Sequence, residues 1–445
     1  MRRAPGHPAA LGPVLAIAVA ILVAVATLTA PATAQTQARD HLVAPLGSVA
    51  ADAAETSDGT RAAPFPSVLH AIRSGAVRPG DRLVLQDGHH GALRLVNHSF
   101  DPPLRIEAET PGAAHVERIA IRGGRGLSFS GLAVWPREPR DHIRLIHTTS
   151  DAAHMRFHAM DLRGSPDAPD TYMTWSAEDW LATRRHSGAR LEGPHNTLTG
   201  SRITATAFAI TTMGPHAEVR GNIVEGFSGD AMRGLASHAV FADNRVANCV
   251  DVDGNHDDAF QSWARDTGGT GRAEISDITI ENNVMLEWIG APDHPLRCTL
   301  QGIGLFNGPF RNFTIRNNII AISAWHGISI YRGSDSRIVN NTLIHTSGGP
   351  STDRPWIGVF ESGPGSRITV ANNVAPAFRG IPEPQRTNLA ARYPARLFRD
   401  PATLDLAPLP DGPLVDAGQP DIAPDDDLLR RPRDTRPDLG ALEAR

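Results

Sequence analysis

One short stretch of the sequence places a histidine among several carboxylates. Residues 251–258 read DVDGNHDD, so His256 stands directly before Asp257 and Asp258. An imidazole titrates near neutral pH and can act as a general acid or base, particularly beside a carboxylate. The stretch is therefore either part of a catalytic site or a solvated acidic turn.

Asp258 also begins one of six segments of six residues that share a pattern. In each segment, a small second residue is followed by an apolar third one. The segments begin at Thr206, Asp230, Asp258, Gln301, His326 and Ile357. Their third residues are Phe208, Met232, Phe260, Ile303, Ile328 and Val359. Because side chains alternate along a strand, the third residue is expected to face a core, and the fourth and sixth to face outward.

Polar side chains gather at the leading and outward positions of the middle segments. They are Asp230, Arg233, Asp258, Gln261, Trp263, Gln301, His326 and Tyr331, with Arg332 next along the chain. If the segments stack as neighbouring strands about 4.8 Å apart, Asp230 and Asp258 face each other. Two such carboxylates must share a proton, pair with Arg233, or bind a cation such as Ca²⁺.

These residues suit the removal of a proton next to the carboxylate of a uronic acid. We expect His256 or His326 to be the base, with Asp258 beside it, and Tyr331 to be the proton donor. Arg233, or Ca²⁺ held by Asp230, Asp257 and Asp258, would neutralise the substrate carboxylate. The expected substrate contacts are Gln261, Trp263, Gln301, Arg332 and Trp175, the last from an inserted loop. Packing of that loop on its own scaffold is the alternative for Trp175.

The elements that position these residues are indicated by a repeat. Short β-prone runs recur and end at Gly, Asn or Pro, and six asparagines precede apolar or β-branched positions: Asn222, Asn244, Asn283, Asn318, Asn341 and Asn373. Their spacings of 22, 39, 35, 23 and 32 residues fit one solenoid coil, or one coil with a loop. Asn tolerates the left-handed backbone conformation, and its amide can bond the Asn of the next coil. The pattern predicts an all-β, right-handed parallel β-helix, resembling pectate lyase, over residues 64–387.

The ends of the solenoid are expected to be covered. Val68, Leu69 and Ile72 share one helical face, which predicts an N-terminal cap helix. Ser176 and Asp179 form a candidate capping box, which predicts a helix in the inserted loop. Residues 35–63 are expected to be a linker or disordered start, and residues 388–445 an irregular C-terminal strap.

The N-terminus has the order of a secretory signal peptide. Arg2 and Arg3 precede an apolar run and the small residues Ala32-Thr33-Ala34, so we expect cleavage after residue 34 and a periplasmic or secreted protein. Subtracting the two arginine charges from the net charge of −5 leaves −7, which argues against a nucleic-acid partner. A monomer that is not held in a membrane after cleavage is expected.

The remaining composition limits the chemistry. The 43 basic residues are all Arg, so no Lys can serve as a base. Cys249 and Cys298 form either one disulfide, as export would allow, or two buried thiols. His154 and His158 show no spacing that indicates a metal site.

Several stretches resemble a known family. Residues 79–88, 103–112 and 126–132 resemble the opening coils of polysaccharide lyases of the chondroitinase B and alginate lyase type. Residues 416–418, 430–433 and 438–443 are similar to the closing segment of secreted β-helix proteins. His256-Asp257-Asp258 with Gln261 resembles a His-x-Asp-x-x-Gln pattern of β-helix carbohydrate-modifying proteins and, more loosely, of mannuronan epimerases. The resemblance implies an acidic polysaccharide as substrate, but those lyases use a Lys base, which is absent here.

Three functions follow from these patterns. The first is an exported lyase or epimerase acting on uronate-containing polysaccharide or oligosaccharide. The second is a glycoside hydrolase that uses Asp230 with Asp257 or Asp258 as its acid and base pair. The third is a non-catalytic polysaccharide-binding or surface protein.

Overall fold

The fold is known from a computed structural model, which describes residues 38–138, 142–264, 273–381 and 387–444. The expected signal peptide, residues 1–34, lies outside the described residues. In the described part of the chain, no helix is long and apolar enough to cross a membrane.

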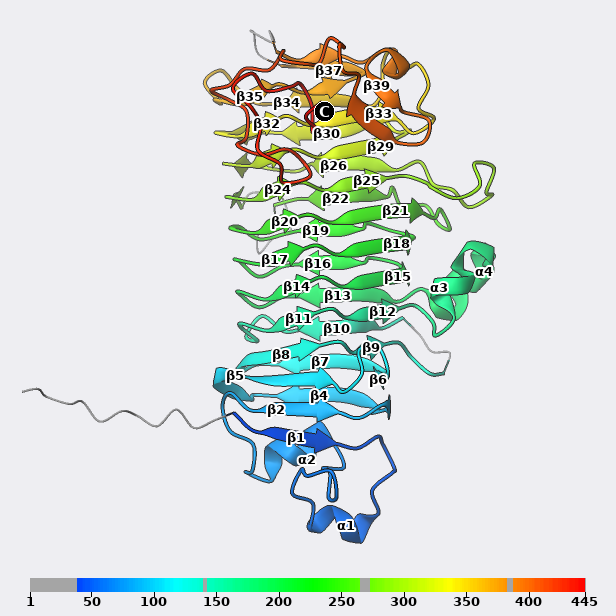
Figure 1. Ribbon diagram of the computed structural model, residues 1–445, viewed down its shortest axis with the longest axis vertical. Coiled ribbons are helices and arrows are strands. Elements are labelled where there is room, and N and C mark those ends of the chain that lie inside the picture. The colour runs from blue at the N-terminus through cyan, green and yellow to red at the C-terminus, as the bar shows by residue number, and fades with distance from the viewer. Residues whose placement is uncertain (1–37, 139–141, 265–272, 382–386, 445) are drawn as a thin grey trace, which may run out of the picture. The chain divides into compact units, whose positions relative to one another are not determined.

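Three long parallel sheets form the body of the molecule (Figure 1). Sheet A contains, in spatial order, β1 (Asp40–Val43), β2 (Arg82–Leu85), β5 (Ser99–Ala108), β8 (Arg125–Ser130), β11 (Arg156–His158), β14 (Thr197–Thr199), β17 (Glu218–Arg220), β20 (Val240–Ala242), β24 (Thr279–Glu281), β28 (Thr314–Arg316), β32 (Arg337–Val339) and β35 (Thr369–Ala371). Sheet B contains β3 (Gly88–His89), β6 (Ala114–Val116), β9 (Ala133–Val134), β12 (Asp161–Arg163), β15 (Arg202–Thr206), β18 (Ile223–Phe227), β21 (Arg245–Cys249), β25 (Val284–Leu286), β29 (Ile319–Ile322), β33 (Thr342–His345), β36 (Val374–Ala375) and β38 (Leu389–Ala390). Sheet C contains β4 (Ala92–Val96), β7 (Arg118–Arg122), β10 (Arg144–Thr148), β13 (Ser187–Leu191), β16 (Ile210–Thr212), β19 (Met232–Gly234), β22 (Asp258–Ser262), β26 (Gln301–Leu305), β30 (His326–Tyr331), β34 (Trp356–Phe360) and β37 (Ala377–Arg379).

Each coil of the chain passes through sheet A, then sheet B, then sheet C, before it returns to sheet A one level higher. A small sheet of β23 (Ile275–Ser276), β27 (Phe310–Arg311) and β31 (Gly333–Ser334) lies at the corner between sheets C and A. Several long insertions connect a strand of sheet B to the next strand of sheet C and extend from the corner between these sheets. They include residues 164–186, 250–257 and 287–300. This arrangement is the predicted parallel β-helix.

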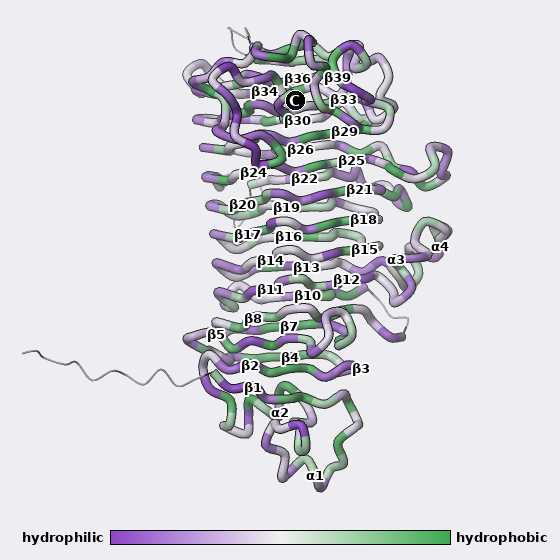
Figure 2. Tube along the Cα trace, viewed as in Figure 1, coloured by the Kyte–Doolittle hydropathy of each residue, from purple (hydrophilic) through white to green (hydrophobic). Residues whose placement is uncertain are grey.

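The core fills the inside of the coils. Hydrophobic and hydrophilic residues alternate along the chain (Figure 2), because neighbouring side chains of a strand point to opposite faces of the sheet. One inward column of sheet C is formed by Met232, Phe260, Ile303 and Ile328, which are wholly buried and paired in register. Burial of such apolar columns is the main stabilising contribution to the fold.

The asparagine ladder is confirmed. The side chain of Asn283 donates a 3.0 Å hydrogen bond to the side chain of Asn318 and accepts one of 3.0 Å from Asn244. The ladder continues through the other predicted asparagines and ends at Asn388. The left-handed conformation, however, falls on the residue before each of the six predicted asparagines, as at Asn282 with φ 56°. The ladder residue itself is held by its side-chain bonds instead.

The N-terminal end departs from the expected boundary. The cap helix is present as α2 (Val68–Arg73), with Ser67 as its N-cap. Residues 40–43, expected in a linker, form β1 and pair with β2, and α1 (Ala51–Glu55) follows. Val43 and Phe65 are wholly buried and pair with each other, so the core extends into a segment that is rich in small and polar residues.

The inserted loop of residues 164–186 contains the expected capped helix. Ser176 and Asp179 form the capping box of α4 (Ala177–Asp179), which follows α3 (Ala168–Thr171) and a 3₁₀ turn, Tyr172–Thr174; a π-helical turn, Trp180–Arg184, comes after it. The loop carries its own apolar cluster, which packs against residues of sheet B and of the neighbouring loops.

The C-terminal strap begins later than expected, because β38 still pairs with β36. It includes a 3₁₀ turn, Pro394–Arg396, and an antiparallel pair, β39 (Phe398–Asp400) and β40 (Asp405–Pro408). The strap then runs along the outside of the coils, where its backbone accepts hydrogen bonds from the side chains of Asn317, Asn340 and Asn372.

Candidate active site

The predicted polar residues come together on the outer face of sheet C. β19, β22, β26 and β30 stack in the predicted register, with Met232 opposite Phe260, Ile303 and Ile328 in turn. One position further along, Arg233 pairs with Gln261, and Gln261 with Gly304. These outward positions form a continuous column over the sheet.

The alignment of the first and last segments is wrong by two residues. Ile210, not Phe208, lies opposite Met232, and Ile357, not Val359, lies opposite Ile328. A shift of two residues keeps the inward parity, so each inward position is still apolar. Phe208 precedes the first residue of β16 and is therefore not bound by this alternation. Its ring lies on the outer side, and its centre is 3.6 Å from the guanidinium of Arg233.

Asp230 and Asp258 lie on adjacent coils and are almost wholly buried. The Arg233 side chain donates a hydrogen bond to Oδ2 of Asp230, and the backbone N–H of Asp258 donates one of 3.1 Å to Oδ1 of Asp230. Of the alternatives for these carboxylates, the pairing of Asp230 with Arg233 is the one observed.

Asp258 connects the buried network to the surface. Its Oδ2 accepts a 3.0 Å hydrogen bond from Nε2 of Gln261 and lies 3.0 Å from Nδ1 of His256. The side chain of His256 is 63% exposed, whereas that of Asp258 is not exposed at all. The buried carboxyl group of Asp258 therefore orients the solvent-accessible imidazole of His256.

Gly304 leaves room above this carboxyl group. A side-chain carbon at residue 304 would lie 2.8 Å from Oδ1 of Asp258 and 2.3 Å from the ring of Phe306. Oδ1 has no hydrogen-bond partner among the described residues. The absence of a side chain at Gly304 therefore lets the ring of Phe306 and the buried carboxyl group of Asp258 occupy this space.

The pKa values of the aspartates in this region are raised above their ordinary range. Burial raises the pKa of Asp258 to about 7, and the nearby charge of Asp230 adds to this rise while His256 opposes it. Burial also raises the pKa of Asp230, although Arg233 opposes the rise. The hydrogen bond to Asp258 in turn raises the pKa of His256. Such shifts are frequent at functional sites, and also occur in structural ion-pair networks.

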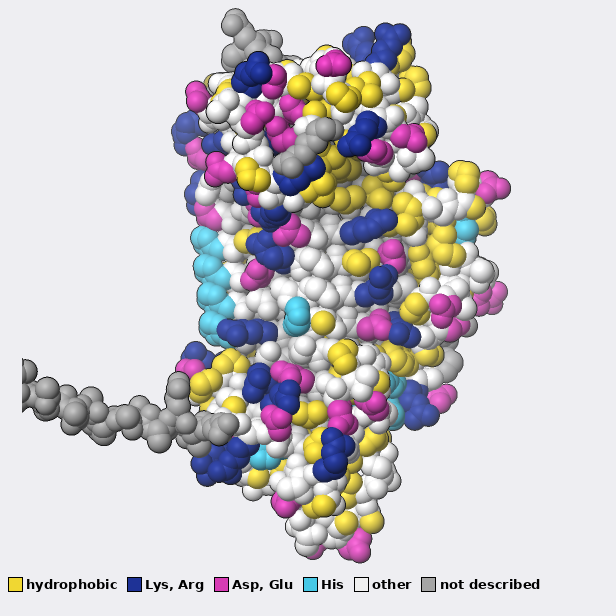
Figure 3. Space-filling model, in the orientation of Figure 1, with side chains coloured by type: hydrophobic (Ala, Val, Ile, Leu, Met, Phe, Trp, Pro, Cys, Tyr) yellow, Lys and Arg dark blue, Asp and Glu magenta, His cyan; other side chains and the backbone are white. Residues whose placement is uncertain are grey.

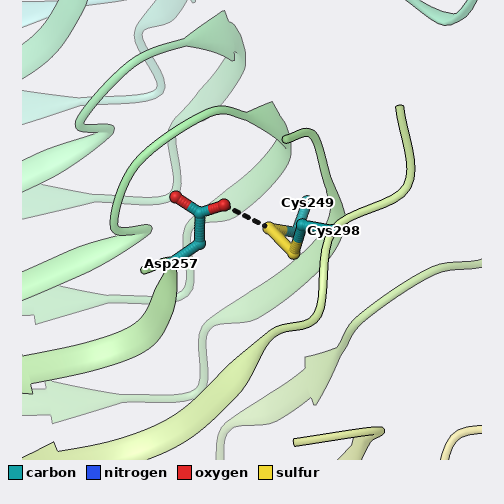
Figure 4. A group of neighbouring side chains, drawn as sticks. All are labelled: Cys249, Asp257 and Cys298. Carbon is teal, nitrogen blue, oxygen red and sulfur yellow. Dashed lines mark hydrogen bonds between the residues drawn. A yellow bond between two sulfur atoms is a disulfide. The ribbon is translucent and has the colours of Figure 1, made fainter. Parts of the chain in front are cut away.

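Asp257 points away from its neighbour, into the corner between sheets B and C. Cys249 and Cys298 form a disulfide, which decides between the two alternatives left by the sequence. Oδ2 of Asp257 lies 3.4 Å from Sγ of Cys249 (Figure 4). A disulfide sulfur carries no proton, so Asp257 is the partner that can donate, and burial raises its pKa to about 7.

This geometry does not suit a Ca²⁺ site at Asp230, Asp257 and Asp258. Ca²⁺ takes about six to eight oxygen ligands. Here Asp257 faces a disulfide, Asp230 is bound to Arg233, and Asp258 is bound to His256 and Gln261. The disulfide sulfurs are likewise not thiolates that could bind a metal.

A pocket of about 520 Å³ opens over these coils. It is lined by His256, Gln261, Ser262, Trp263, Gln301, Phe306, Asn307, His326 and Tyr331. Six of the predicted site residues therefore share one pocket. Ser262, Phe306 and Asn307 were not predicted, although Phe306 occupies the sixth, outward position of its segment.

His326 and Tyr331 occupy opposite ends of β30. Nδ1 of His326 lies 2.8 Å from Oγ of Ser329, and burial, with the nearby charge of His256, lowers its pKa. The ring of Tyr331 stacks on Phe360 at 4.7 Å, and burial raises the pKa of its hydroxyl, so the phenol stays protonated. The two histidines of the pocket thus have pKa values shifted in opposite directions.

Two predicted contacts lie elsewhere. Arg332 is exposed on the turn after β30 and does not line the pocket. Trp175 is 5% exposed and packs edge-on against Trp180 at 5.1 Å inside the cluster of the inserted loop. The loop therefore packs on its own scaffold, which was the alternative for Trp175.

A second pocket, of about 460 Å³, continues along sheet C and shares Trp263 with the first. Its charged lining residues include Arg144, Arg190 and Arg233. Arg190 is paired with Glu192. In the part of the chain that the structure describes, no carboxylate lies within ion-pair distance of Arg144, whose pKa is lowered by burial and by Arg190. The two pockets adjoin at Trp263 and are together called the groove; the first is lined by aromatic and histidine rings, and the second contains three arginines.

A larger hollow of about 960 Å³ lies between sheet B and the C-terminal strap. Its lining is mainly apolar, with Arg245, Arg297 and Asp405 as the charged residues. It contains neither histidine nor a pair of acids, so the chemistry is concentrated in the smaller groove.

Comparison with known proteins bears on the fold. The profile of the family described as "Right handed beta helix region" matches residues 178–377. The chain is a right-handed parallel β-helix. A search of the curated proteins finds no match to it.

Several solved structures are similar to this β-helix. Pectate lyase Pel9A is 16% identical, with 92% of this chain and 96% of that chain covered and a TM-score of 0.48. A rhamnogalacturonan lyase is 12% identical, with 75% and 87% covered and a TM-score of 0.47. A PL6 family polysaccharide lyase from Pseudopedobacter saltans is 12% identical, with 73% and 90% covered and a TM-score of 0.41.

Proposed function

We propose that this β-helix is an exported enzyme that removes the proton next to the carboxylate of a uronate unit in an acidic polysaccharide. The observation that carries the proposal is one groove that joins His256, fixed by the buried Asp258, with His326, Tyr331 and a neighbouring arginine-lined pocket. An anionic chain needs cationic contacts along its length and an acid and a base at one unit.

The two histidines divide the work. His326 has a lowered pKa, is neutral near pH 7, and acts as the base through the nitrogen that does not contact Ser329. His256 has a raised pKa and carries the proton that interacts with the substrate carboxylate. When the surroundings of two titratable groups shift their pKa values apart, the group with the lower pKa is suited to accept a proton and the group with the higher pKa to carry one.

Tyr331 completes the reaction. Its protonated hydroxyl donates to the glycosidic oxygen that leaves C4 after the proton at C5 has been removed, which makes the reaction a β-elimination. An epimerase shares the first step and then returns a proton to the other face of C5. Trp263 and Phe306 supply apolar surfaces for sugar rings.

The geometry favours this reading over a hydrolase. Glycoside hydrolysis generally needs two carboxyl groups that flank the glycosidic bond. Asp230, Asp257 and Asp258 are all buried, and none lines the pocket. A non-catalytic binding protein remains the alternative that the experiment below distinguishes.

The protein is incubated with alginate, pectate, chondroitin and dermatan, with and without Ca²⁺, while ultraviolet absorbance of unsaturated uronate and reducing ends are followed together. A rise in both signals is expected, with loss in H326N and retention in H158N, a variant of an exposed histidine outside the groove. Reducing ends alone would establish a hydrolase. Binding without turnover, and without a change in uronate composition by NMR, would overturn the enzymatic proposal.

A further inference from the structure

Four histidines form a column on the outside of the solenoid, at the corner between sheets C and A. His154, His195, His216 and His238 belong to successive coils, and all four are exposed. Neighbouring ring centres lie 4.6, 4.5 and 4.7 Å apart, with planes within 2°, 2° and 9° of parallel. Figure 3 shows this row of histidine side chains along one edge of the molecule. The sequence spacing did not reveal it, because one intervening coil carries the inserted loop.

The backbone explains the position of the column but not its residue type. Each of the four histidines has a left-handed backbone, with φ of 55°, 57°, 59° and 63°. The backbone N–H of His154 donates to the carbonyl of Pro194, and that of His195 to Pro215. In the next coils, the same corner position holds Asp277, Asn312 and Asp335. Because Asn and Asp satisfy this conformation as well as His does, the fold alone does not require four imidazoles.

Neutral imidazole is the side chain that Zn²⁺, Cu²⁺ and Ni²⁺ most often bind in proteins. Metal–nitrogen bonds of about 2.0–2.1 Å place the two nitrogens of one ion roughly 3–4 Å apart. The stacked rings, 4.5–4.7 Å apart, direct their in-plane lone pairs parallel to one another, so two of them converge on one ion only after each ring turns by roughly 45–55°. The exposed side chains have room to make this rotation. At the end of the column, Nδ1 of His238 lies 3.5 Å from Oδ2 of Asp277, which offers a carboxylate ligand beside an imidazole.

We propose that this histidine column binds divalent transition-metal ions, each held between two imidazoles of neighbouring coils. The four rings then accommodate two ions, one between His154 and His195 and one between His216 and His238. The column is separate from the groove, since none of its residues lines either pocket of sheet C. The inference therefore does not depend on the proposed enzymatic activity.

Two double variants test the proposal with the same number of histidines. H195N/H216N leaves His154 and His238, which are three ring spacings apart, whereas H154N/H238N leaves the adjacent rings of His195 and His216. Asn is used because it tolerates the left-handed backbone. Untagged protein is titrated with Cu²⁺ alone by calorimetry near neutral pH, and electron paramagnetic resonance reports the coordinating nitrogens. Thermal unfolding of each variant establishes that it is folded.

The expected number of ions held between two imidazoles of the column is two in the wild type, one in H154N/H238N and none in H195N/H216N. Loss of a group that only hydrogen-bonds to a metal ligand weakens metal affinity by about 10–100-fold. Loss of one of the two imidazole ligands should therefore weaken the affinity at least about tenfold. The His89 and His115 rings, whose Nδ1 atoms lie 3.1 Å apart, are common to all variants, so any ion bound there cancels in the comparison. Equal binding by the two folded double variants, or no loss relative to the wild type in H195N/H216N, would overturn the proposal.

Discussion

Nδ1 of His256 lies 3.0 Å from Oδ2 of Asp258, so an accessible imidazole is joined to a carboxyl group with no exposed surface. This contact links the buried centre of the solenoid to the groove on its outside. Because Nδ1 of His256 contacts Asp258, Nε2 is the ring nitrogen that is left to face the groove.

Replacement of Asp258 by Asn should uncouple His256 from the core. The variant loses the group that raises the pKa of His256, so this pKa should fall toward its ordinary value. The rate constant for turnover should fall by about a hundredfold or more, since removal of one positioned donor that stabilises a developing negative charge costs about 10²–10³-fold. NMR titration of His256 and the pH profile of kcat measure the two effects. A large loss of activity with an unchanged His256 pKa would contradict the role assigned to the contact.

The contribution of Asp257 and Asp258 to the stability of the protein should decrease as pH rises from about 4 to about 7. Asp257 and Asp258 have pKa values near 7 in the folded protein but near 3.8 when unfolded, so the folded state binds more protons within this window. Their contribution is favourable at low pH and is lost as pH passes the folded pKa. Measured by calorimetry, the Tm of the wild type relative to that of D257N should fall as pH rises through this window, whereas D411N, at an exposed position, should follow the wild type.

Replacement of Arg144 by Gln should weaken substrate binding rather than chemistry. Arg144 lines the pocket beside the proposed reacting unit and has no carboxylate partner in the described part of the chain, so an anionic substrate group can take that place. A hydrogen bond to a charged group is worth about 1.5–3 kcal/mol, which corresponds to a rise in KM of about tenfold or more. Initial rates over a range of salt concentrations measure KM and kcat separately. R396Q, at an exposed strap residue, is the control, and a selective loss of kcat in R144Q would contradict the assignment.

Removal of the disulfide should affect both stability and the groove. Cys249 and Cys298 are 49 residues apart, and closing a loop of this length restricts the unfolded chain by about 4 kcal/mol. The bridge also anchors the segment that carries Asp257 and His256. C249A/C298A should therefore unfold at lower denaturant concentration and show a reduced kcat. A stability loss with full activity would indicate that the β-strand alone positions His256.

Replacement of Asn318 by Ala should strongly destabilise the solenoid. The side chain of Asn318 donates to Ile280 and Asn341 and accepts two hydrogen bonds from Asn283, all of them buried. Each buried group left without a partner costs about 1–3 kcal/mol, so the free energy of unfolding should fall by at least about 3 kcal/mol. Chemical denaturation measures this loss. N388A, at the half-buried end of the ladder, should lose less.

Much of the fold could be predicted because the ladder asparagines mark the same corner in successive coils from Asn222 to Asn388. The middle segments of sheet C were also placed correctly, since each contains one small residue before one apolar residue. At Ala207-Phe208-Ala209-Ile210 the same motif occurs twice, two residues apart, so the pattern alone could not choose between Phe208 and Ile210. At the other end, an irregularity between His326 and Ile328 shifts the pairing with β34.

The parts of the site that could not be predicted depend on register between distant coils. Arg144 lies on β10, which has no small residue before its apolar one, and Arg190 lies on β13, where Gly188 is followed only by Ala189 as the apolar residue. Both join the groove because these strands pair in sequence order across the inserted loop. The same loop provides a helix signal in its sequence but none for the side on which Trp175 packs. That side is decided by contacts within a cluster that contains Trp180 of the same loop and also Val250 and Trp288, which come from other parts of the chain.

The bonds between the strap and Asn317, Asn340 and Asn372 have a mechanical consequence. Because these asparagines belong to three consecutive coils, the last coils cannot fray one at a time while the strap remains attached. A pulling force on the C-terminus must first peel the strap from all three levels, and only then can the coils beneath it unwind.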